Sequence, residues 1–201
     1  TQEKVSENNR RGPVIICIDT SGSMLGKPEQ IAKATALAVL KIANKDERDV
    51  HLILFSGPSQ YKEYTLSHST FSRKKILERV KQNPMLSIND WPNLKQNYYN
   101  SILEFLAISF GGGTDFRTPL EKAKEMLAKP EFQKADILFI TDGVSFIDEF
   151  ITNVVKEIEA TEARIFGLII GTNQKIVREF ASQLYCFDPN ALSTSTSSRI
   201  N

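Results

Sequence analysis

The sequence is poor in cysteine and histidine, the residues that build disulfide frameworks, zinc sites and most acid–base centres. Its 201 residues include two cysteines, Cys17 and Cys186, and two histidines, His51 and His68. Two cysteines make neither a disulfide scaffold nor a zinc site. Because both lie in apolar, strand-like runs, we expect buried, reduced thiols and a cytoplasmic protein. We expect His51 to pack within a strand and His68 to lie at the surface, which leaves acid–base catalysis few candidates.

An excess of charge and a long apolar run are also missing. The formal net charge is +1, from 25 Lys and Arg against 24 Asp and Glu, and no basic stripe stands out. This balance argues against nucleic-acid binding and gives little support for association with a membrane surface. No apolar run reaches the roughly 18 residues of a membrane span. Because there is neither a signal peptide nor an initiator methionine, we expect a fragment or a processed form.

Apolar runs alternate with helical patterns along the chain. Runs of apolar residues predict buried strands, and an alternating pattern predicts an edge strand at 61–66 that pairs antiparallel with its predecessor. The predicted buried strands are 14–19, 49–55, 135–142, 164–170 and 184–187, and the predicted helices are 28–43, 71–82, 98–110, a segment from 118 onward, 148–161 and 175–182. This order predicts an α/β fold, a doubly wound, mostly parallel sheet of about six strands with helices on both faces.

Two of the helices carry more detailed predictions. We expect the helix at 28–43 to turn an apolar stripe toward the sheet, made of Ile31, Ala34, Ala38 and Ile42. We expect the helix after the glycine turn to begin at Thr118, where the sequence has capping-box spacing and a proline at the first helical position.

Carboxylates and hydroxyls follow three of the predicted elements. Asp19-Thr20-Ser21-Gly22-Ser23 follows the first strand, Thr114 and Asp115 follow three glycines, and Asp142 ends the strand at 135–142. In a doubly wound sheet, Asp19 and Asp142 stand side by side at the carboxyl edge, where the strand order reverses. Two such carboxylates repel unless one is protonated or a cation lies between them. Hard oxygen ligands suit Mg²⁺, so a cation is the simpler interpretation.

Other interpretations of the first motif are a helix-capping turn and a phosphate site. Ser and Asp are common at helix starts. Gly22 and Gly26-Lys27 resemble a phosphate-binding loop, but the spacing is one residue short and Pro28 stands where a hydroxyl residue belongs. A phosphatase with an aspartyl nucleophile usually has a second Asp two residues on, where this chain has Ser21. A metal-dependent phosphohydrolase therefore remains the alternative function.

Taken in order, the Asp19 to Ser23 motif, Thr114 and Asp142 resemble the metal-ion-dependent adhesion site of von Willebrand factor A domains. The resemblance covers about residues 13–188. It implies that Ser21, Ser23 and Thr114 bind the metal through hydroxyls, and that Asp19 and Asp142 act directly or through bound waters. The metal would be Mg²⁺, or another divalent cation such as Mn²⁺ or Ca²⁺. The implied function is non-catalytic capture of an acidic side chain of a partner protein.

Within that superfamily the chain resembles ViaA-like proteins, the partners of MoxR-family AAA+ ATPases such as RavA. The resemblance implies that the partner is such an ATPase or its client. It rests on Ile18 to Met24, Glu29-Gln30, Leu54-Phe55-Ser56, Gly112 to Asp115 and Phe187-Asp188. Asp115 either braces the glycine turn, which we prefer, or binds backbone amides of the neighbouring loop.

The expected domain organisation is a linker or tail at 1–12, one domain at 13–188 and a Ser/Thr-rich disordered tail at 189–201. Within the domain, about 67–97 exceeds what a ViaA-like pattern needs, and we expect an insertion there, either a partner-specific arm or a lid. Four of its apolar residues form an interaction patch or simply cover the domain. These four are Met85, Leu86, Ile88 and Trp91.

Overall fold

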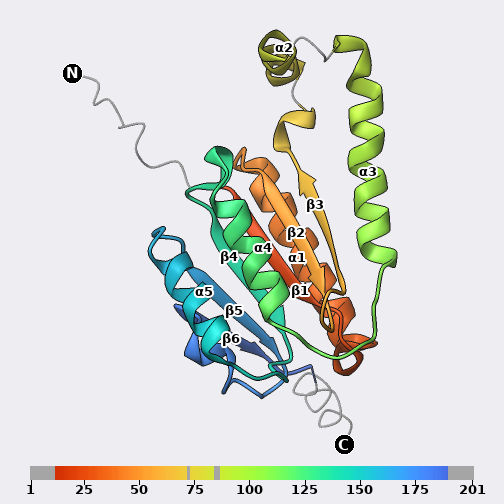
Figure 1. Cartoon of the computed structure of the whole chain (residues 1–201). Coiled ribbons are helices and arrows are strands. Elements are labelled where there is room, and N and C mark those ends of the chain that lie inside the picture. Colours follow the sequence, from red (N-terminus) through yellow and green to blue (C-terminus); the bar gives the residue numbers. More distant parts are fainter. Residues whose placement is uncertain (1–11, 72, 84–86, 190–201) are drawn as a thin grey trace, which may run out of the picture.

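The computed structural model describes residues 12–71, 73–83 and 87–189 (Figure 1). These residues form a six-stranded sheet in the order β3-β2-β1-β4-β5-β6. β2 and β3 pair antiparallel, and the other neighbouring strands pair parallel. The strands are β1 (Val14–Asp19), β2 (Val50–Phe55), β3 (Tyr61–Leu66), β4 (Asp136–Thr141), β5 (Ile165–Ile170) and β6 (Gln183–Phe187). The predicted α/β class is confirmed, as is the pairing of β1 with β4 where the order reverses.

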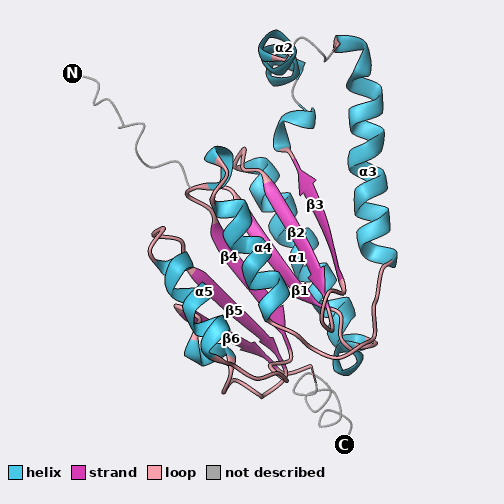
Figure 2. Ribbon diagram, in the orientation of Figure 1, coloured by secondary structure: helices cyan, strands magenta, loops and turns pink. Residues whose placement is uncertain are grey.

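Helices cover both faces of this sheet (Figure 2). They are α1 (Lys27–Lys45), α3 (Trp91–Ala107), α4 (Arg117–Leu127) and α5 (Glu149–Glu159), whereas α2 (Arg73–Gln82) lies beyond the end of β3, away from the sheet. Ile15 and Cys17 of β1 pack in the core under α4 and α5, whereas Ile16 and Ile18 pack in the core under α1. Because successive strand residues point to opposite faces, covering both faces requires the nearly continuous apolar runs of the sequence. The predicted tails lie outside the described residues, apart from the few that adjoin the domain.

The predicted inner stripe of α1 is wrong at three of its four residues, whereas Ile31 is partly buried and packs against the core. Ala34 and Ala38 are exposed, and Ile42 is 59% exposed. The face that packs on the sheet is made of Ala32, Ala36, Leu40 and Ala43, together with the polar pair Glu29 and Lys33. Both stripes have helical spacing, so spacing alone could not choose between them. Small alanines allow the helix to lie close to the strands.

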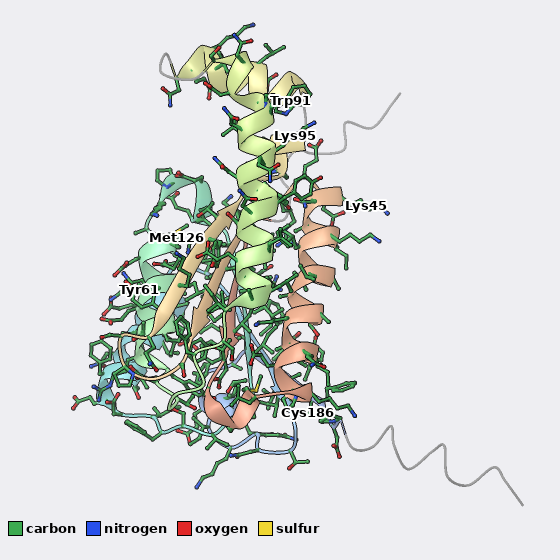
Figure 3. The ribbon with its side chains drawn as sticks, turned by 90° about the vertical axis from the view of Figure 1, so that its right-hand side faces the viewer. Lys45, Tyr61, Trp91, Lys95, Met126 and Cys186 are labelled. Atoms are coloured by element: carbon green, nitrogen blue, oxygen red, sulfur yellow. The ribbon has the colours of Figure 1, made fainter. Side chains whose placement is uncertain are left out.

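The predicted helix at 98–110 begins earlier and ends earlier than expected. α3 runs over Trp91–Ala107, with Pro92 in its first turn. A proline there gives up only an N–H that would have no helical partner, so Pro92 marks a helix start and not a break. Trp91 donates from Nε1 to the Thr70 carbonyl at 2.8 Å, and Lys95 lies over its ring at 4.1 Å (Figure 3). Trp91 therefore ties α3 to the turn after β3; Met85 and Leu86 lie outside the described residues.

Three further details correct the sequence-based predictions. The segment at 175–182 forms only a short 3₁₀ turn, Val177–Glu179. α4 begins at Arg117 and not at Thr118, and Phe116, which precedes it, forms no side-chain cap hydrogen bond. Cys17 is buried as expected, and burial raises its thiol pKa, but Cys186 is exposed because it lies on edge strand β6.

The two histidines differ in their surroundings. His51 is buried, with Nδ1 2.8 Å from Thr65 Oγ1 and Nε2 3.0 Å from Glu63 Oε1, which confirms the packing role. His68 is half-buried rather than freely exposed, since its Nδ1 lies 2.6 Å from Asp49 Oδ1. Neither histidine is near the edge of the sheet where the predicted metal ligands lie.

The buried His51 predicts an acid-sensitive fold. Burial lowers the pKa of His51 below the ordinary value of about 6.5, more than Glu63 raises it. Between the folded pKa and about 6.5 the unfolded chain binds more protons, so stability rises with pH across that window. We expect unfolding free energy to fall as pH drops below about 6.5, and His51→Gln to flatten that part of the profile. Denaturant titrations at several pH values measure this; an unchanged slope in the variant would refute it.

Candidate functional site

The end of β1 buries a carboxylate among hydrogen-bond donors. Asp19 is fully buried. Its Oδ1 accepts from the Ser21 backbone N–H at 2.8 Å, and its Oδ2 accepts from Thr141 Oγ1 at 2.6 Å. Thr141 Oγ1 in turn accepts from the Gly143 N–H at 3.0 Å. The ends of β1 and β4 are thereby joined through one carboxylate, which holds the two following loops side by side.

The glycine turn packs directly on the loop after β1. The Gly22 N–H donates to the Gly112 carbonyl at 2.8 Å, and the Gly111 N–H donates to the Thr20 carbonyl at 2.9 Å. A Cβ at Gly22 would lie 3.2 Å from the Gly111 oxygen, which is tighter than an ordinary contact, so a larger residue would push the glycine turn away by a few tenths of an ångström. Thr114 follows this turn and is half-buried.

Ser56 organises the glycine turn and was not among the predicted site residues. It is fully buried at the end of β2. Its Oγ donates to the Gly113 carbonyl at 2.9 Å and accepts from the Gly112 N–H at 3.1 Å, and its own carbonyl accepts from the Asp115 N–H at 2.8 Å. The signal that could have found Ser56 is its position, a hydroxyl residue after the strand that neighbours β1.

Asp142 lies in the loop after β4, half-buried. Its Oδ1 accepts from the Val144 N–H at 3.1 Å. Ser145 donates from Oγ to the Thr114 carbonyl at 3.4 Å, so this loop also meets the glycine turn. The loops that carry Asp19, Thr114 and Asp142 are thus in mutual contact at the carboxyl edge of the parallel strands, the lower edge in Figure 1.

The backbone conformation of Gly143 sets the path of the loop after β4. Substituting this glycine tests the described loop conformation. Its φ of +80° is left-handed, and a Cβ there would lie 2.0 Å from the Asn173 carbonyl oxygen. Gly26 has a similar φ of +85° but open space around its Cβ position. At Gly26 the ψ of −127° places the backbone in a region that only glycine adopts readily, so we expect Gly26→Ala to cost about 1–3 kcal/mol of unfolding free energy from strain alone. Gly143→Ala should cost more, because the backbone must also shift to relieve the clash. Denaturant unfolding of both variants measures this; equal losses would contradict the described loop.

Burial dominates the electrostatics of the site. It raises the pKa of Asp19 above its ordinary value, the hydrogen bonds from Thr141 and Ser21 lower it in part, and the charge of Asp142 raises it further. Asp19 and Asp142 are therefore close enough to repel each other electrostatically. An ionised Asp19 is unfavourable in this setting unless positive charge is supplied nearby.

Asp115 braces the turn, as preferred from the sequence. Its Oδ1 accepts from the Arg117 N–H at 3.1 Å, and its Oδ2 accepts from Thr118 Oγ1 at 3.3 Å. Both partners lie in the first turn of α4, so Asp115 joins the glycine turn to the helix that follows it.

Two hydroxyls complete the arrangement. Ser21 Oγ and Ser23 Oγ lie 3.2 Å apart. Among the residues that the structure describes, no three or more His, Cys, Asp or Glu side chains are grouped as metal ligands would be. A cation bound at this edge would therefore depend on hydroxyl oxygens as well as on Asp19 and Asp142.

The family model described as von Willebrand factor type A domain matches residues 14–144. This chain belongs to the von Willebrand factor type A domain family.

The predicted likeness to ViaA is also confirmed. Regulatory protein ViaA of Proteus mirabilis is 32% identical over 170 residues, which are 84% of this chain and 29% of that protein. An uncharacterized protein of Methanocaldococcus jannaschii is 32% identical over 165 residues, which are 81% of this chain and 31% of that protein. The chain spans about a third of these relatives' length.

Solved structures share the fold. Proximal thread matrix protein 1 from the mussel byssus has a TM-score of 0.57 at 16% identity, over 92% of this chain and 45% of that one. The same protein has also been solved with a zinc-occupied adhesion-site motif. The manganese-loaded TRAP protein of Plasmodium vivax has a TM-score of 0.53 at 18% identity, over 92% of this chain and 72% of that one. Separately, none of the described helices combines the length and apolar character needed to traverse a bilayer.

Proposed function

We propose that this domain binds a divalent cation at the carboxyl edge of its sheet and uses it to capture an acidic side chain of a partner protein. The proposed ligands are Asp19, Ser21, Ser23, Thr114 and Asp142, and the proposed ion is Mg²⁺. The observation that carries the proposal is the meeting of their three loops around a buried carboxylate whose pKa is raised by burial and by Asp142.

The donor chemistry fits such an ion. All five proposed ligands offer oxygen, which Mg²⁺ prefers. Two oxygens bound at right angles to one Mg²⁺, each about 2.1 Å away, lie about 3.0 Å apart. The 3.2 Å between Ser21 Oγ and Ser23 Oγ is close to that spacing. A cation would also supply the positive charge that an ionised Asp19 lacks.

The proposed role is binding without catalysis. Neutral hydroxyls would leave the charge of the ion only partly offset, so it would favour an anionic oxygen from outside, such as an Asp or Glu carboxylate. The related ViaA is a regulatory protein by name, which supports a protein partner. We propose that this partner is a MoxR-family AAA+ ATPase or its client, and that the interaction takes place in the cytoplasm.

Thr114→Ala tests the proposed ligand set at a residue that, unlike Asp19, is not fully buried. We expect Mg²⁺ affinity to fall at least about tenfold, with the fold intact, because Thr114 lies at the edge of the sheet. The matched control is Thr35→Ala, which removes a half-buried hydroxyl that donates to the Ile31 carbonyl within α1 and should leave Mg²⁺ affinity unchanged. Calorimetric Mg²⁺ titration of metal-free protein measures both. Equal affinities for wild type and Thr114→Ala would remove Thr114 from the site.

The partner and the absence of catalysis are tested separately. Purified MoxR-family ATPase should be retained on the immobilised domain in Mg²⁺ and released by EDTA. A general phosphatase substrate should not be turned over. Turnover that is lost in Asp19→Ala would instead favour the metal-dependent phosphohydrolase.

A further inference from the structure

Large apolar side chains are exposed on the loops that carry the proposed metal ligands. Leu25 follows the Asp19 motif and is 54% exposed, and Val144 and Phe146 follow Asp142 at 52% and 60%. Monomeric proteins usually keep such side chains from gathering at one place, and where they gather they commonly mark a contact surface. We call Leu25, Val144 and Phe146 the apolar rim.

The apolar rim lies on both sides of the proposed site. A Cβ at Gly111 would lie 3.8 Å from Leu25 Cδ1, so Leu25 stands against the glycine turn that precedes Thr114. On the other side, the Val144 N–H donates to Asp142, and Ser145, between Val144 and Phe146, donates to the Thr114 carbonyl. An anionic group that reached an ion at this site would therefore have apolar side chains beside it.

The nearby basic side chains are already engaged. Arg117 forms an ion pair with Asp148, and its guanidinium lies 5.7 Å from the centre of the Phe150 ring. Lys27 donates from Nζ to the Pro189 carbonyl at 2.8 Å. These contacts leave Arg117 and Lys27 poorly placed to attract a run of acidic residues. The proposed cation would then be the main positive charge offered to a partner here, with apolar contact around it.

We infer that the domain recognises a peptide segment in which a single Asp or Glu is flanked by large apolar residues. This inference rests on the proposed function, because the acidic residue is the one that would reach the metal. The flanking residues would cover Leu25 on one side and Val144 with Phe146 on the other. Contact of this kind adds affinity through burial of apolar surface, whereas a polyacidic segment would leave the rim facing water or charge.

A displayed library of random short peptides, selected in Mg²⁺ and eluted with EDTA, tests the inference. We expect the eluted sequences to share an Asp or Glu with aliphatic or aromatic residues beside it. A synthetic peptide of the selected sequence should bind Phe146→Ser and Val144→Ser at least about tenfold more weakly than wild type. Both variants should keep the Mg²⁺ affinity of wild type, since neither changes a proposed ligand.

Ile42→Ser is the matched control. Ile42 is 59% exposed, close to the 60% of Phe146, but lies in the last turn of α1, which ends at Lys45 (labelled in Figure 3), at the opposite end of the helix from the Asp19 motif. It should bind the selected peptide as wild type does. EDTA-eluted peptides that contain an acid without apolar neighbours, or equal binding by Phe146→Ser and wild type, would overturn the inference while leaving the proposed function standing.

Two other outcomes would also be decisive. If no peptide is released by EDTA from wild type although calorimetry shows Mg²⁺ binding, the inference is overturned and the proposed metal site stands; if calorimetry shows no Mg²⁺ binding either, both fail. If wild type sediments with phosphatidylserine vesicles and Phe146→Ser does not, while acidic peptides are not selected, the apolar rim contacts lipid and the inference is overturned.

Discussion

Asp19→Asn should abolish Mg²⁺ binding while leaving the domain folded. The substitution keeps the shape of the side chain and one oxygen that can accept from the Ser21 N–H, but removes the charge at the centre of the proposed site. In wild type, Mg²⁺ at a hundredfold excess over its Kd should add about 2.7 kcal/mol to the unfolding free energy. The same concentration should add nothing measurable to Asp19→Asn. Denaturant unfolding with and without Mg²⁺ measures both quantities.

The metal-free proteins should differ in the opposite direction. Because the pKa of Asp19 is raised in the folded state, the folded protein binds more protons than the unfolded chain between the two pKa values, and stability is lost as pH rises through that window. At a pH above the folded-state pKa of Asp19, this contribution to the stability of the metal-free protein is fully lost. Metal-free Asp19→Asn should therefore be more stable than metal-free wild type at neutral pH, with the difference shrinking toward acid pH. A variant that is unfolded, or that gains stability from Mg²⁺ as wild type does, would contradict the assignment.

Lys33→Met should cost about 3–5 kcal/mol of unfolding free energy. Lys33 Nζ lies 2.6 Å from Glu29 Oε1 and donates to the Leu106 and Ile108 carbonyls at 3.0 and 2.7 Å. The side chains of Lys33 and Glu29 are only 10% and 9% exposed, so removing one leaves the other buried and unpaired. Ser109, which donates to Glu29 Oε2 at 2.8 Å, cannot replace the lost charge.

Two further variants distinguish the effect of breaking this buried ion pair from the general effect of removing a lysine. Lys41→Met removes an exposed lysine of the same helix and should change stability by less than about 0.5 kcal/mol. The double variant Glu29→Leu with Lys33→Met should recover most of the loss, because no unpaired charge remains. Equal losses in the single and double variants would show that the pair is not coupled. Because Lys33 holds the segment that leads to Gly111, the single variant should also bind Mg²⁺ more weakly.

The sheet and the pairing of β1 with β4 could be predicted because the sequence patterns behind them are compatible with only one arrangement of the strands. Apolar runs separated by helices leave little choice but a parallel sheet, and adjacent strand ends then bring Asp19 and Asp142 together. The face of α1 could not be predicted in the same way, since two stripes share helical spacing. The stripe that packs inward includes Glu29 and Lys33, two charges that pair with each other along α1, and Lys33 also donates to the carbonyls of Leu106 and Ile108 at the end of α3.

The start of α3 and the role of Ser56 were missed for different reasons. Pro92 breaks a helix in its interior but suits its first turn, and only the contact of Trp91 with Thr70 shows which applies. The sequence marks Ser56 only as part of the Leu54-Phe55-Ser56 likeness to ViaA, without a role at the site. Its importance comes from hydrogen bonds to Gly112 and Gly113, which lie far along the chain and can be assigned only when the strands are in register.

The location of a bound ion tests the central proposal most directly. Crystals grown with Mn²⁺ in place of Mg²⁺ would reveal the ion by its anomalous scattering. We predict a single strong peak within coordination distance of the hydroxyls of Ser21, Ser23 and Thr114, beside Asp19 and Asp142. Crystals that hold no ion among these five side chains at saturating Mn²⁺, or that hold it elsewhere on the domain, would contradict the proposal.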